Sequence, residues 1–270
     1  MTLWTTETTQ DVIRVANLAA DAAKSKTLQY FRSEGLLTEN KELAGFDPVT
    51  AADRAAENAI REILAVERPD DAIIGEEYGS SGGSSGLTWV LDPIDGTRGY
   101  ISGTPTWGTL ISVSDETGPA IGLIDQPYIG ERFIGGPGLA TFSGPLGQRR
   151  LSTRGTKSLA DAILLTTFPE VGSEIERSAF MAVNDRVKLT RYGMDCYGYA
   201  LLAAGQVDLV IEAGLQAYDI HAPIAVIEAA GGIVTNWEGR PAHDGGRVIA
   251  AANSTLHDQA LSVLRGVIDG

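Results

Sequence analysis

Apolar residues recur at helical spacing in the first quarter of the chain. Between residues 9 and 31 they fall three or four positions apart, and they do so again between residues 50 and 64. This spacing predicts two amphipathic helices, each of which buries one face. The Asp47-Pro48 pair in the connecting segment and Pro69 beyond the second helix are typical of positions outside helices.

Shorter apolar runs then predict the strands of a sheet. The first, residues 72–75, ends at Glu76, and the run Trp89–Leu91 leads directly into Asp92. A Gly/Ser-rich stretch at residues 80–86 predicts a flexible loop between these two strands. Further strands are predicted at residues 107–113 and 119–134, with turns near Gly118 and Gly130.

Turn-forming residues cluster between residues 135 and 147. This cluster predicts a boundary between two subdomains, residues 1–145 and 146–270. Beyond it, strand-like and helix-like runs alternate, which favours an α/β arrangement. The predicted strands are residues 162–167, 208–212 and 248–251, and the predicted helices are residues 196–204, 222–230 and 256–268.

Composition and charge limit the kind of partner. The 270 residues are 43% hydrophobic, as is usual for a globular protein, and carry a net charge of −14. This charge argues against non-specific binding to nucleic acid or to an anionic membrane. The single cysteine excludes an internal disulfide and favours a reducing compartment. No basic, apolar leader opens the sequence, and no run approaches the ~20 apolar residues of a membrane span, so we expect a cytoplasmic protein.

The segment Asp92-Pro-Ile-Asp-Gly-Thr97 places two carboxylates at the end of a buried strand. Two unit charges ~4 Å apart repel by about 4 kcal/mol at an effective dielectric of ~20, so ionised acids there need a cation, a base or protonation. The alternative is an ordinary turn, because Asp-Pro and Asp-Gly are common in loops. We favour a cation site, because other segments of the chain fit it.

Three further acids have both a structural and a chemical interpretation. Glu76 follows a predicted strand, and such a glutamate is most often a surface residue. Asp219 opens an apolar helix, where an aspartate usually caps the helix or interacts with its dipole. Thr50 and Asp53 have the spacing of a capping box, with Asp in place of the usual Glu. Taken singly, each acid is explained by local structure.

Taken together, these segments resemble the inositol monophosphatase family of metal-dependent, lithium-sensitive phosphatases. The resemblance covers most of the chain, and its most specific part is the Asp-Pro-Ile-Asp-Gly-Thr stretch. It implies a layered α-β-α-β-α sandwich with an α+β N-terminal part, an α/β C-terminal part and the site between them. It also implies a homodimer. The matching segments, in the family's order, are Asp47–Asp53, Gly75–Glu77, Trp89–Thr97 and Tyr218-Asp219 before a helix that ends in Ala-Gly-Gly.

The resemblance further implies a site for two to three Mg²⁺ ions. One ion would be held by Glu76, Asp92 and the carbonyl oxygen of Ile94, and a second by Asp92, Asp95 and Asp219. A third, weaker ion would lie near Glu76. Ligation by oxygen atoms with retained water is what Mg²⁺ prefers.

The reaction implied by the resemblance is direct in-line attack of a metal-activated water on phosphorus. Thr97 would hydrogen-bond this water and Asp53 would accept the Thr97 proton; Glu76 is counted with them as catalytic. The backbone N–H groups of Gly96 and Thr97, at the start of a short predicted helix, would face the phosphate. Cys196 has no basic partner in sequence and is not assigned as the nucleophile.

Later segments are similar to the histidinol-phosphate phosphatase branch of this family. The substrate of that branch carries an amine and an imidazole, which suit acidic contacts, and the candidate acids are Asp195 and Glu212. Arg98 would shape the same pocket. The alternatives are structural, with Asp195 capping the helix from Cys196 and Glu212 ending a strand. The segments with this similarity are Arg98–Leu110, Ile124–Pro127, Gly130–Arg132 and Tyr192–Tyr197.

Rival functions remain open at this point. Within the superfamily they are an inositol monophosphatase and a nucleotide 3′-phosphatase, although the latter usually has a Lys-Glu pair where this chain has Arg98-Gly99. A rival of another class is a noncatalytic metal-binding or regulatory protein on the same fold. It would be expected to lack Thr97, Asp53 or a metal ligand, and none of these is missing. We therefore expect a phosphoric monoester hydrolase that acts on a small phosphate ester.

Overall fold

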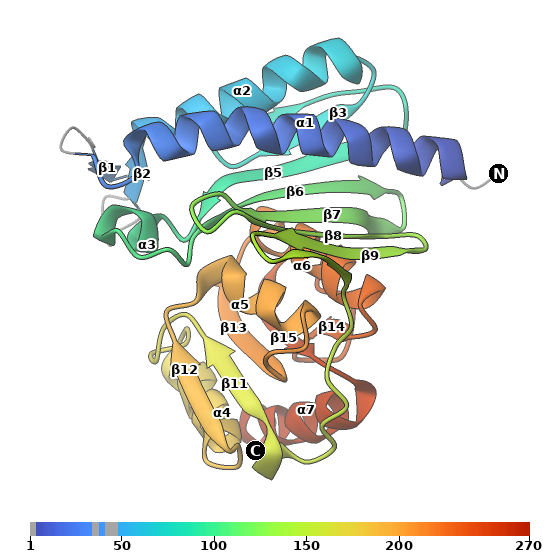
Figure 1. Ribbon diagram of the computed structural model, residues 1–270. Coiled ribbons are helices and arrows are strands. Elements are labelled where there is room, and N and C mark those ends of the chain that lie inside the picture. Colours follow the sequence, from blue (N-terminus) through green and yellow to red (C-terminus); the bar gives the residue numbers. More distant parts are fainter. Residues whose placement is uncertain (1–3, 34–37, 41–47) are drawn as a thin grey trace.

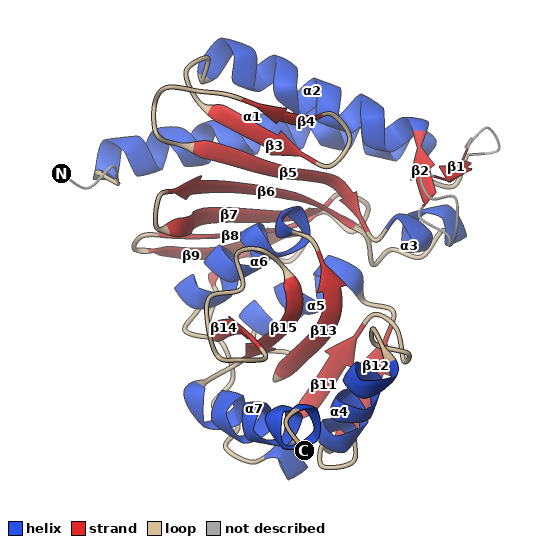
Figure 2. Ribbon diagram, turned by 180° about the vertical axis from the view of Figure 1, so that it is seen from behind, coloured by secondary structure: helices blue, strands red, loops and turns tan. Residues whose placement is uncertain are grey.

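The computed structural model describes residues 4–33, 38–40 and 48–270, and it has five layers (Figure 1). Two helices cover one face of an eight-stranded sheet, two more lie between this sheet and a five-stranded sheet, and a third pair covers the far face of the second sheet (Figures 1 and 2). This is the predicted α-β-α-β-α sandwich. Asp47, the first residue of one matching segment, lies outside the described residues.

Helices α1 (Thr6–Tyr30) and α2 (Ala51–Glu67) are the two predicted amphipathic helices. Their apolar faces form one hydrophobic cluster with the first sheet, in which Val15 and Ile60 lie with the fully buried Trp89. Burying one large apolar side chain is worth about 1.5–3 kcal/mol. The helices are therefore stabilised by this packing.

The first sheet has the strand order β10-β9-β8-β7-β6-β5-β3-β4. The pair β3 and β5 is parallel, and the other neighbours are antiparallel. The predicted flexible loop at residues 80–86 begins within β4, which pairs with β3. The strands are β3 (Ala72–Gly75), β4 (Gly79–Ser81), β5 (Thr88–Asp95), β6 (Gly108–Asp115), β7 (Gly118–Gln126), β8 (Glu131–Gly136), β9 (Leu139–Gly144) and β10 (Gly147–Arg150), and a separate two-stranded sheet holds β1 (Thr38–Asn40) and β2 (Pro48–Thr50).

The turn cluster predicted at residues 135–147 is largely strand. Residues 139–144 form β9, because pairing with β8 on one side and β10 on the other overrides the local turn preference. The glycines supply the tight turns between these strands, for example Gly138 with φ of 73°. The predicted subdomain division between residues 145 and 146 falls in the β9–β10 turn and stays a prediction.

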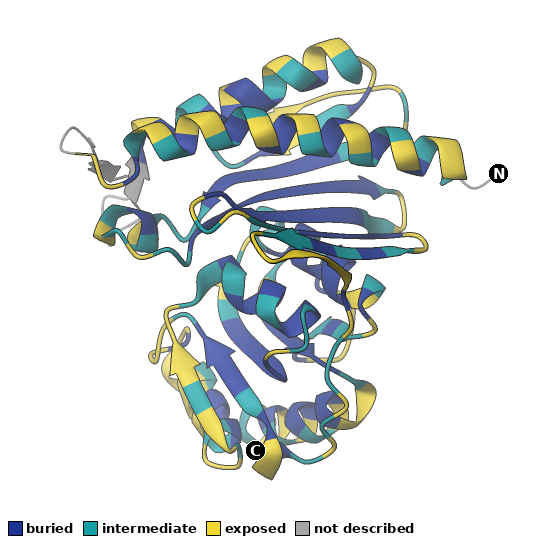
Figure 3. Cartoon of the chain, viewed as in Figure 1, coloured by how far each residue is buried: buried dark blue, intermediate teal, exposed yellow. Residues whose placement is uncertain are grey.

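The second sheet has the order β12-β11-β13-β15-β14. Its three predicted strands are present, whereas β12, β14 and α4 were not predicted. The central strands are buried, and the two helices between the sheets are buried or half-buried along most of their length (Figure 3). The elements are β11 (Ile163–Thr166), β12 (Leu189–Tyr192), β13 (Leu209–Leu215), β14 (Ile233–Asn236), β15 (Gly246–Ala251), α4 (Glu174–Asn184), α5 (Asp195–Ala203), α6 (Ala217–Ala229) and α7 (Ser254–Ile268). No helix in the described part of the chain has the length and apolar character needed to cross a membrane.

Candidate active site

An irregularity in β5 brings Asp92 and Asp95 into one cluster. In a regular strand, residues three positions apart point to opposite faces. Here Asp92 is paired with Leu110 of β6 and Asp95 with Gly108, so β5 has one residue more than its neighbour over this stretch. Such a bulge re-aims the side chains beside it. The two carboxylates consequently meet at the end of the strand.

After the bulge the chain turns sharply into α3 (Thr97–Ser102), the short helix predicted from the sequence. Gly96 has a φ of 85°, and a Cβ at this position would lie 2.8 Å from the Cβ of Asp195. Only glycine meets both requirements without strain. The Thr97 hydroxyl donates a hydrogen bond to the carbonyl oxygen of Ile94 at 3.2 Å.

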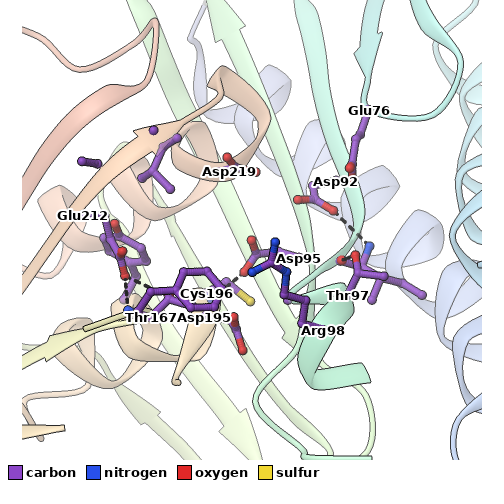
Figure 4. Close-up of a pocket in the computed structure, with 17 residues that line it drawn as sticks. Glu76, Asp92, Asp95, Thr97, Arg98, Thr167, Asp195, Cys196, Glu212 and Asp219 are labelled. Atoms are coloured by element: carbon purple, nitrogen blue, oxygen red, sulfur yellow. Dashed lines mark hydrogen bonds between the residues drawn. The ribbon is translucent and has the colours of Figure 1, made fainter. Parts of the chain in front are cut away.

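Glu76 and Asp219 reach the same cluster from two other elements (Figure 4). Glu76 directly follows β3, and the parallel pairing of β3 with β5 places it beside Asp92. Asp219 lies in the first turn of α6, where its Oδ2 accepts the N–H of Gln216 at 2.7 Å, so the helix-cap interpretation is confirmed. The carboxylates of Asp92, Asp95 and Asp219 each offer an oxygen within 4.8 Å of the others.

The carboxylates of this cluster repel one another when they are ionised, because they are close together and buried. Burial raises the pKa of Asp92 well above its usual range, and the charges of Glu76, Asp95 and Asp219 raise it further. Burial and the charge of Asp219 raise the pKa of Asp95, although the Cys196 N–H donates to its Oδ2 at 2.5 Å and favours the ionised form. Only protons or a metal ion offset such an arrangement, and the all-oxygen donors fit a hard cation such as Mg²⁺.

A pocket of about 270 Å³ joins this cluster to residues of the second sheet (Figure 4). It brings together residues that lie far apart in the sequence, from the strand ends of both sheets and from α5. All but one of the predicted site residues line it. These are Glu76, Asp92, Ile94, Asp95, Gly96, Thr97, Arg98, Asp195, Glu212 and Asp219.

Asp53 is the predicted site residue that does not line the pocket. Its Oδ2 accepts the Thr50 N–H at 2.9 Å and the Thr50 hydroxyl at 2.5 Å, so the capping box is confirmed. Its Oδ1 is buried and has no hydrogen-bond partner among the described residues. Burial raises the pKa of Asp53 to about 7 against the hydrogen bonds from Thr50, with the charges of Glu77 and Glu76 adding to the rise. A catalytic role for Asp53 stays a prediction.

Asp195 lines the pocket and is not the N-cap of a helix. It is the first residue of α5, whose N-cap is Met194, so the alternative in which Asp195 caps the helix from Cys196 is wrong. Its φ of 46° is one that a short polar side chain tolerates. Its Oδ2 accepts the Thr106 hydroxyl at 2.9 Å, and burial raises its pKa. The hydrogen bond from Thr106 and the charge of Arg98 oppose this rise in pKa.

Glu212 lies inside β13, so the alternative in which it ends a strand is also wrong. Its side chain is 6% exposed. Its two oxygens accept hydrogen bonds from the Thr166 hydroxyl (3.1 Å), the Thr167 hydroxyl (2.9 Å) and the Thr167 N–H (2.7 Å). Burial nevertheless raises the pKa of Glu212 to about 7. Each carboxylate oxygen can accept more than one hydrogen bond, so capacity for a ligand remains.

Several pocket residues were not predicted from the sequence. Phe168, from the segment after β11, stacks under the Arg98 guanidinium at 4.9 Å from the ring centroid and so links the two halves at the pocket. Tyr199 is buried in the pocket wall, and its hydroxyl has no hydrogen-bond partner among the described residues. The only available signal was its position four residues after Asp195, on the same helix face.

Comparisons with known proteins agree with this geometry. A sequence profile described as the inositol monophosphatase family matches residues 8–269. The chloroplastic bifunctional phosphatase IMPL2 of Arabidopsis thaliana is 42% identical over 93% of this chain and 74% of its own length. A histidinol-phosphatase of Streptomyces coelicolor is 36% identical over 94% of this chain and 97% of its own length. The solved structure of an inositol monophosphatase from Zymomonas mobilis has a TM-score of 0.83 at 39% identity, covering 95% of this chain and 98% of that one.

The family match and the similarity to these phosphatases show that the chain is a phosphoric monoester hydrolase. The acidic cluster in the pocket fits this class. The chain belongs to the inositol monophosphatase family. The resemblance seen in the sequence and the expectation of an enzyme are both confirmed.

Proposed function

We propose that this protein hydrolyses histidinol phosphate in a Mg²⁺-dependent reaction. The observation that carries the proposal is that one pocket holds two groups of acids. The first group is the acidic cluster of Asp92, Asp95 and Asp219. The second group is Asp195 and Glu212. A phosphate needs a cation at the first group. An amine and an imidazole are complementary to the second group, because charge-assisted hydrogen bonds to carboxylates are strong. An uncharged polyol has no such need for acids.

The metal ligands are proposed as the resemblance implies. Glu76, Asp92 and the Ile94 carbonyl oxygen would hold one Mg²⁺, and Asp92, Asp95 and Asp219 would hold a second, with a third near Glu76. Bound Mg²⁺ would supply the positive charge that binds the phosphate and polarises a water molecule. The raised pKa values of Asp92 and Asp95 support this assignment, because such carboxylates gain most from a nearby cation.

Thr97 and Asp53 are proposed to orient the attacking water. The unpartnered Oδ1 of Asp53, on a carboxyl with a pKa of about 7, suits a proton acceptor at neutral pH. The Thr97 hydroxyl, which donates to the Ile94 carbonyl, is turned toward the segment that carries the metal ligands. The N–H groups of Gly96 and Thr97 would hold the phosphate.

Phosphate release from a panel of esters tests the proposed substrate. We expect histidinol phosphate to be hydrolysed with the highest kcat/KM, above inositol phosphates and 3′-phosphonucleotides. Inositol phosphate is the second candidate, because a structure 39% identical to this chain is named an inositol monophosphatase. A preference for inositol phosphate would overturn the substrate and leave the family intact.

Two conservative variants test the role of the second acidic group. Glu212→Gln and Asp195→Asn should each raise the KM for histidinol phosphate about tenfold to a hundredfold, because a charge-assisted hydrogen bond is worth roughly 1.5–3 kcal/mol. A small phosphate ester without an amine serves as the control and should be hydrolysed almost as before. Equal losses on both esters would mean that these acids support the metal centre and do not bind the substrate. Arg98, stacked on Phe168, is proposed to shape the entrance to this part of the pocket.

We also propose a cytoplasmic homodimer that binds neither nucleic acid nor membranes. The net charge of −14 supports the absence of a polyanionic partner. Light scattering on the purified protein tests the assembly, and a mass equal to one chain would overturn the dimer.

A further inference from the structure

A buried glutamate on α2 holds the backbone that carries Glu76. Glu57 is fully buried, and its side chain does not enter the pocket. Its Oε2 accepts the N–H of Glu77 at 2.7 Å, and its Oε1 accepts the N–H of Tyr78 at 3.2 Å. The two backbone amides that follow Glu76 are therefore both bound by one carboxylate.

Arg61, one helical turn further along α2, completes the arrangement. Its Nε donates to Glu57 Oε1 at 2.8 Å, and its Nη2 donates to the carbonyl oxygen of Gly79 at 2.5 Å. Burying a carboxylate is costly unless it is paired and hydrogen-bonded, and Glu57 meets both conditions. The Glu57–Arg61 pair thus joins α2 to the turn between β3 and β4, through the N–H groups of residues 77 and 78 and the carbonyl oxygen of residue 79.

Glu57 packs closely against the backbone at the start of this turn. A Cβ added to Gly75 would lie 2.1 Å from Glu57 Oε1, so the carboxylate lies directly against the backbone. On the other side, the Glu76 N–H donates to the Leu91 carbonyl oxygen of β5 at 3.2 Å. The backbone of Glu76 is fixed between β5, which carries Asp92, and the Glu57 carboxylate.

We infer that Glu57 is a positioning residue that sets the Glu76 carboxylate against Asp92 and so raises the affinity of the site for a divalent cation. The inference rests on the proposed metal role of Glu76. Residues that orient a metal ligand without touching the ion typically contribute 10–100-fold to metal affinity or activity. A purely structural Glu57 would instead stabilise the fold and leave the affinity unchanged.

Calorimetric titration of Mg²⁺ into the metal-free protein tests the role of Glu57 directly, and this measurement does not depend on turnover. Glu57→Gln keeps the size of the side chain, but it leaves one acceptor oxygen and sets an amide NH2 against a backbone donor. We expect its Mg²⁺ Kd to rise about tenfold or more. Glu62→Gln, the same substitution at an exposed position of α2, is the matched control and should leave the Kd unchanged.

A double-mutant cycle shows whether Glu57 acts through Glu76. In a Glu76→Gln background, adding Glu57→Gln should change the Kd by less than about twofold, because the positioned ligand is already gone. An unchanged Kd in Glu57→Gln alone, or the same tenfold loss in both backgrounds, would overturn the inference. If Glu57→Gln does not fold, Arg61→Met takes its place in the cycle with the same criteria. Absence of Mg²⁺ binding by the wild-type protein would overturn the metal proposal itself, which distinguishes the two failures.

Discussion

Single residues in or near this pocket are held in states that reduce folding stability. The pKa values of Asp53 and Glu212 are raised to about 7, mainly by burial. The Tyr199 hydroxyl is buried without a partner among the described residues. Functional sites commonly contain such groups, because a ligand or an ion can offset their unfavourable surroundings. Predictions at this scale concern what happens when one such group is removed.

Tyr199→Phe should stabilise the ligand-free protein. A buried hydroxyl without a partner costs about 1–3 kcal/mol, and phenylalanine lacks that hydroxyl. We therefore expect a rise in Tm, by roughly 2–4 °C for each kcal/mol recovered. Tyr197→Phe is the matched control on the same helix: its hydroxyl donates to Glu131 Oε2 at 2.6 Å, so this variant should lose stability. Thermal unfolding of both variants provides the comparison. A fall in Tm for Tyr199→Phe equal to that of the control would mean that the hydroxyl has a partner in solution.

Thr97→Ala and Asp53→Asn separate catalysis from helix capping. If both residues orient the water, each variant should lower kcat by about 10²–10⁴-fold, with a smaller change in KM. If Asp53 is only part of the capping box, Asp53→Asn should leave kcat nearly intact, and its cost in stability should not exceed the ~1 kcal/mol of a lost cap. Steady-state kinetics and melting curves of the two variants decide between these roles.

Secondary-structure elements determine where the acids meet. The bulge in β5 turns Asp92 and Asp95 toward each other, and the parallel pair β3–β5 brings Glu76 alongside. The start of α6 adds Asp219, and the first N–H groups of α5 include the donor to Asp95. Asp219 thus has two roles. One of its oxygens accepts a hydrogen bond in the capping box of α6, and its carboxylate belongs to the acidic cluster.

Asp219→Asn should separate these two roles. Asparagine keeps an acceptor oxygen for the Gln216 N–H, so the helix cap should survive. In the presence of chelator, the variant should therefore melt within about 2 °C of the wild type, whereas loss of the cap would cost ~1 kcal/mol and lower the Tm by more. The Mg²⁺-induced rise in Tm should largely disappear, because a charged ligand is lost. Glu176→Gln, at the equivalent position of the α4 capping box, is the control and should keep the Mg²⁺ effect. A full Mg²⁺ response in Asp219→Asn would remove Asp219 from the metal site.

The whole molecule should lose stability with rising pH when metal is absent. Asp53 and Glu212 have folded pKa values of about 7, above the unfolded values of 3.8 and 4.5, so the folded state binds more protons between those limits. The free energy of unfolding therefore falls as the pH rises from about 4 to about 7, by about 1.4 kcal/mol for each unit of pKa shift. Asp92 and Asp95, whose pKa values are raised too, act in the same direction.

Melting curves with chelator at pH 5 and pH 8 measure this dependence. The Tm should be lower at pH 8, and Mg²⁺ should raise it more at pH 8 than at pH 5, because metal ligands bind in their deprotonated form. Glu212→Gln should flatten part of the dependence, because it removes one of the titrating groups. Burial lowers the pKa values of His221 and His257, and these shifts act in the opposite direction, so the comparison with Glu212→Gln is decisive. The same pH dependence in this variant and in the wild type would contradict the raised pKa of Glu212.

The sequence by itself determined much of the architecture and named most of the residues that line the pocket. The helical spacing at residues 9–31 and 50–64 and the apolar runs before Glu76 and Asp92 are local signals, and they predicted α1, α2, β3 and β5. The Asp92–Thr97 segment gave the acidic cluster, because a buried strand that ends in two carboxylates has few physical explanations. The order of the matching segments predicted the sandwich and the family, and both are confirmed.

Only the tertiary structure decided the remaining features, because they depend on contacts between distant segments. Sheet pairing made β9 a strand where local turn residues predicted a boundary. Packing placed Asp195 and Glu212 in the same pocket as the acidic cluster and gave both carboxyls raised pKa values. The role of Glu57 is equally invisible in the sequence, because a glutamate on an amphipathic helix is usually exposed. Burial against the turn after Glu76 makes it a candidate for setting the metal affinity.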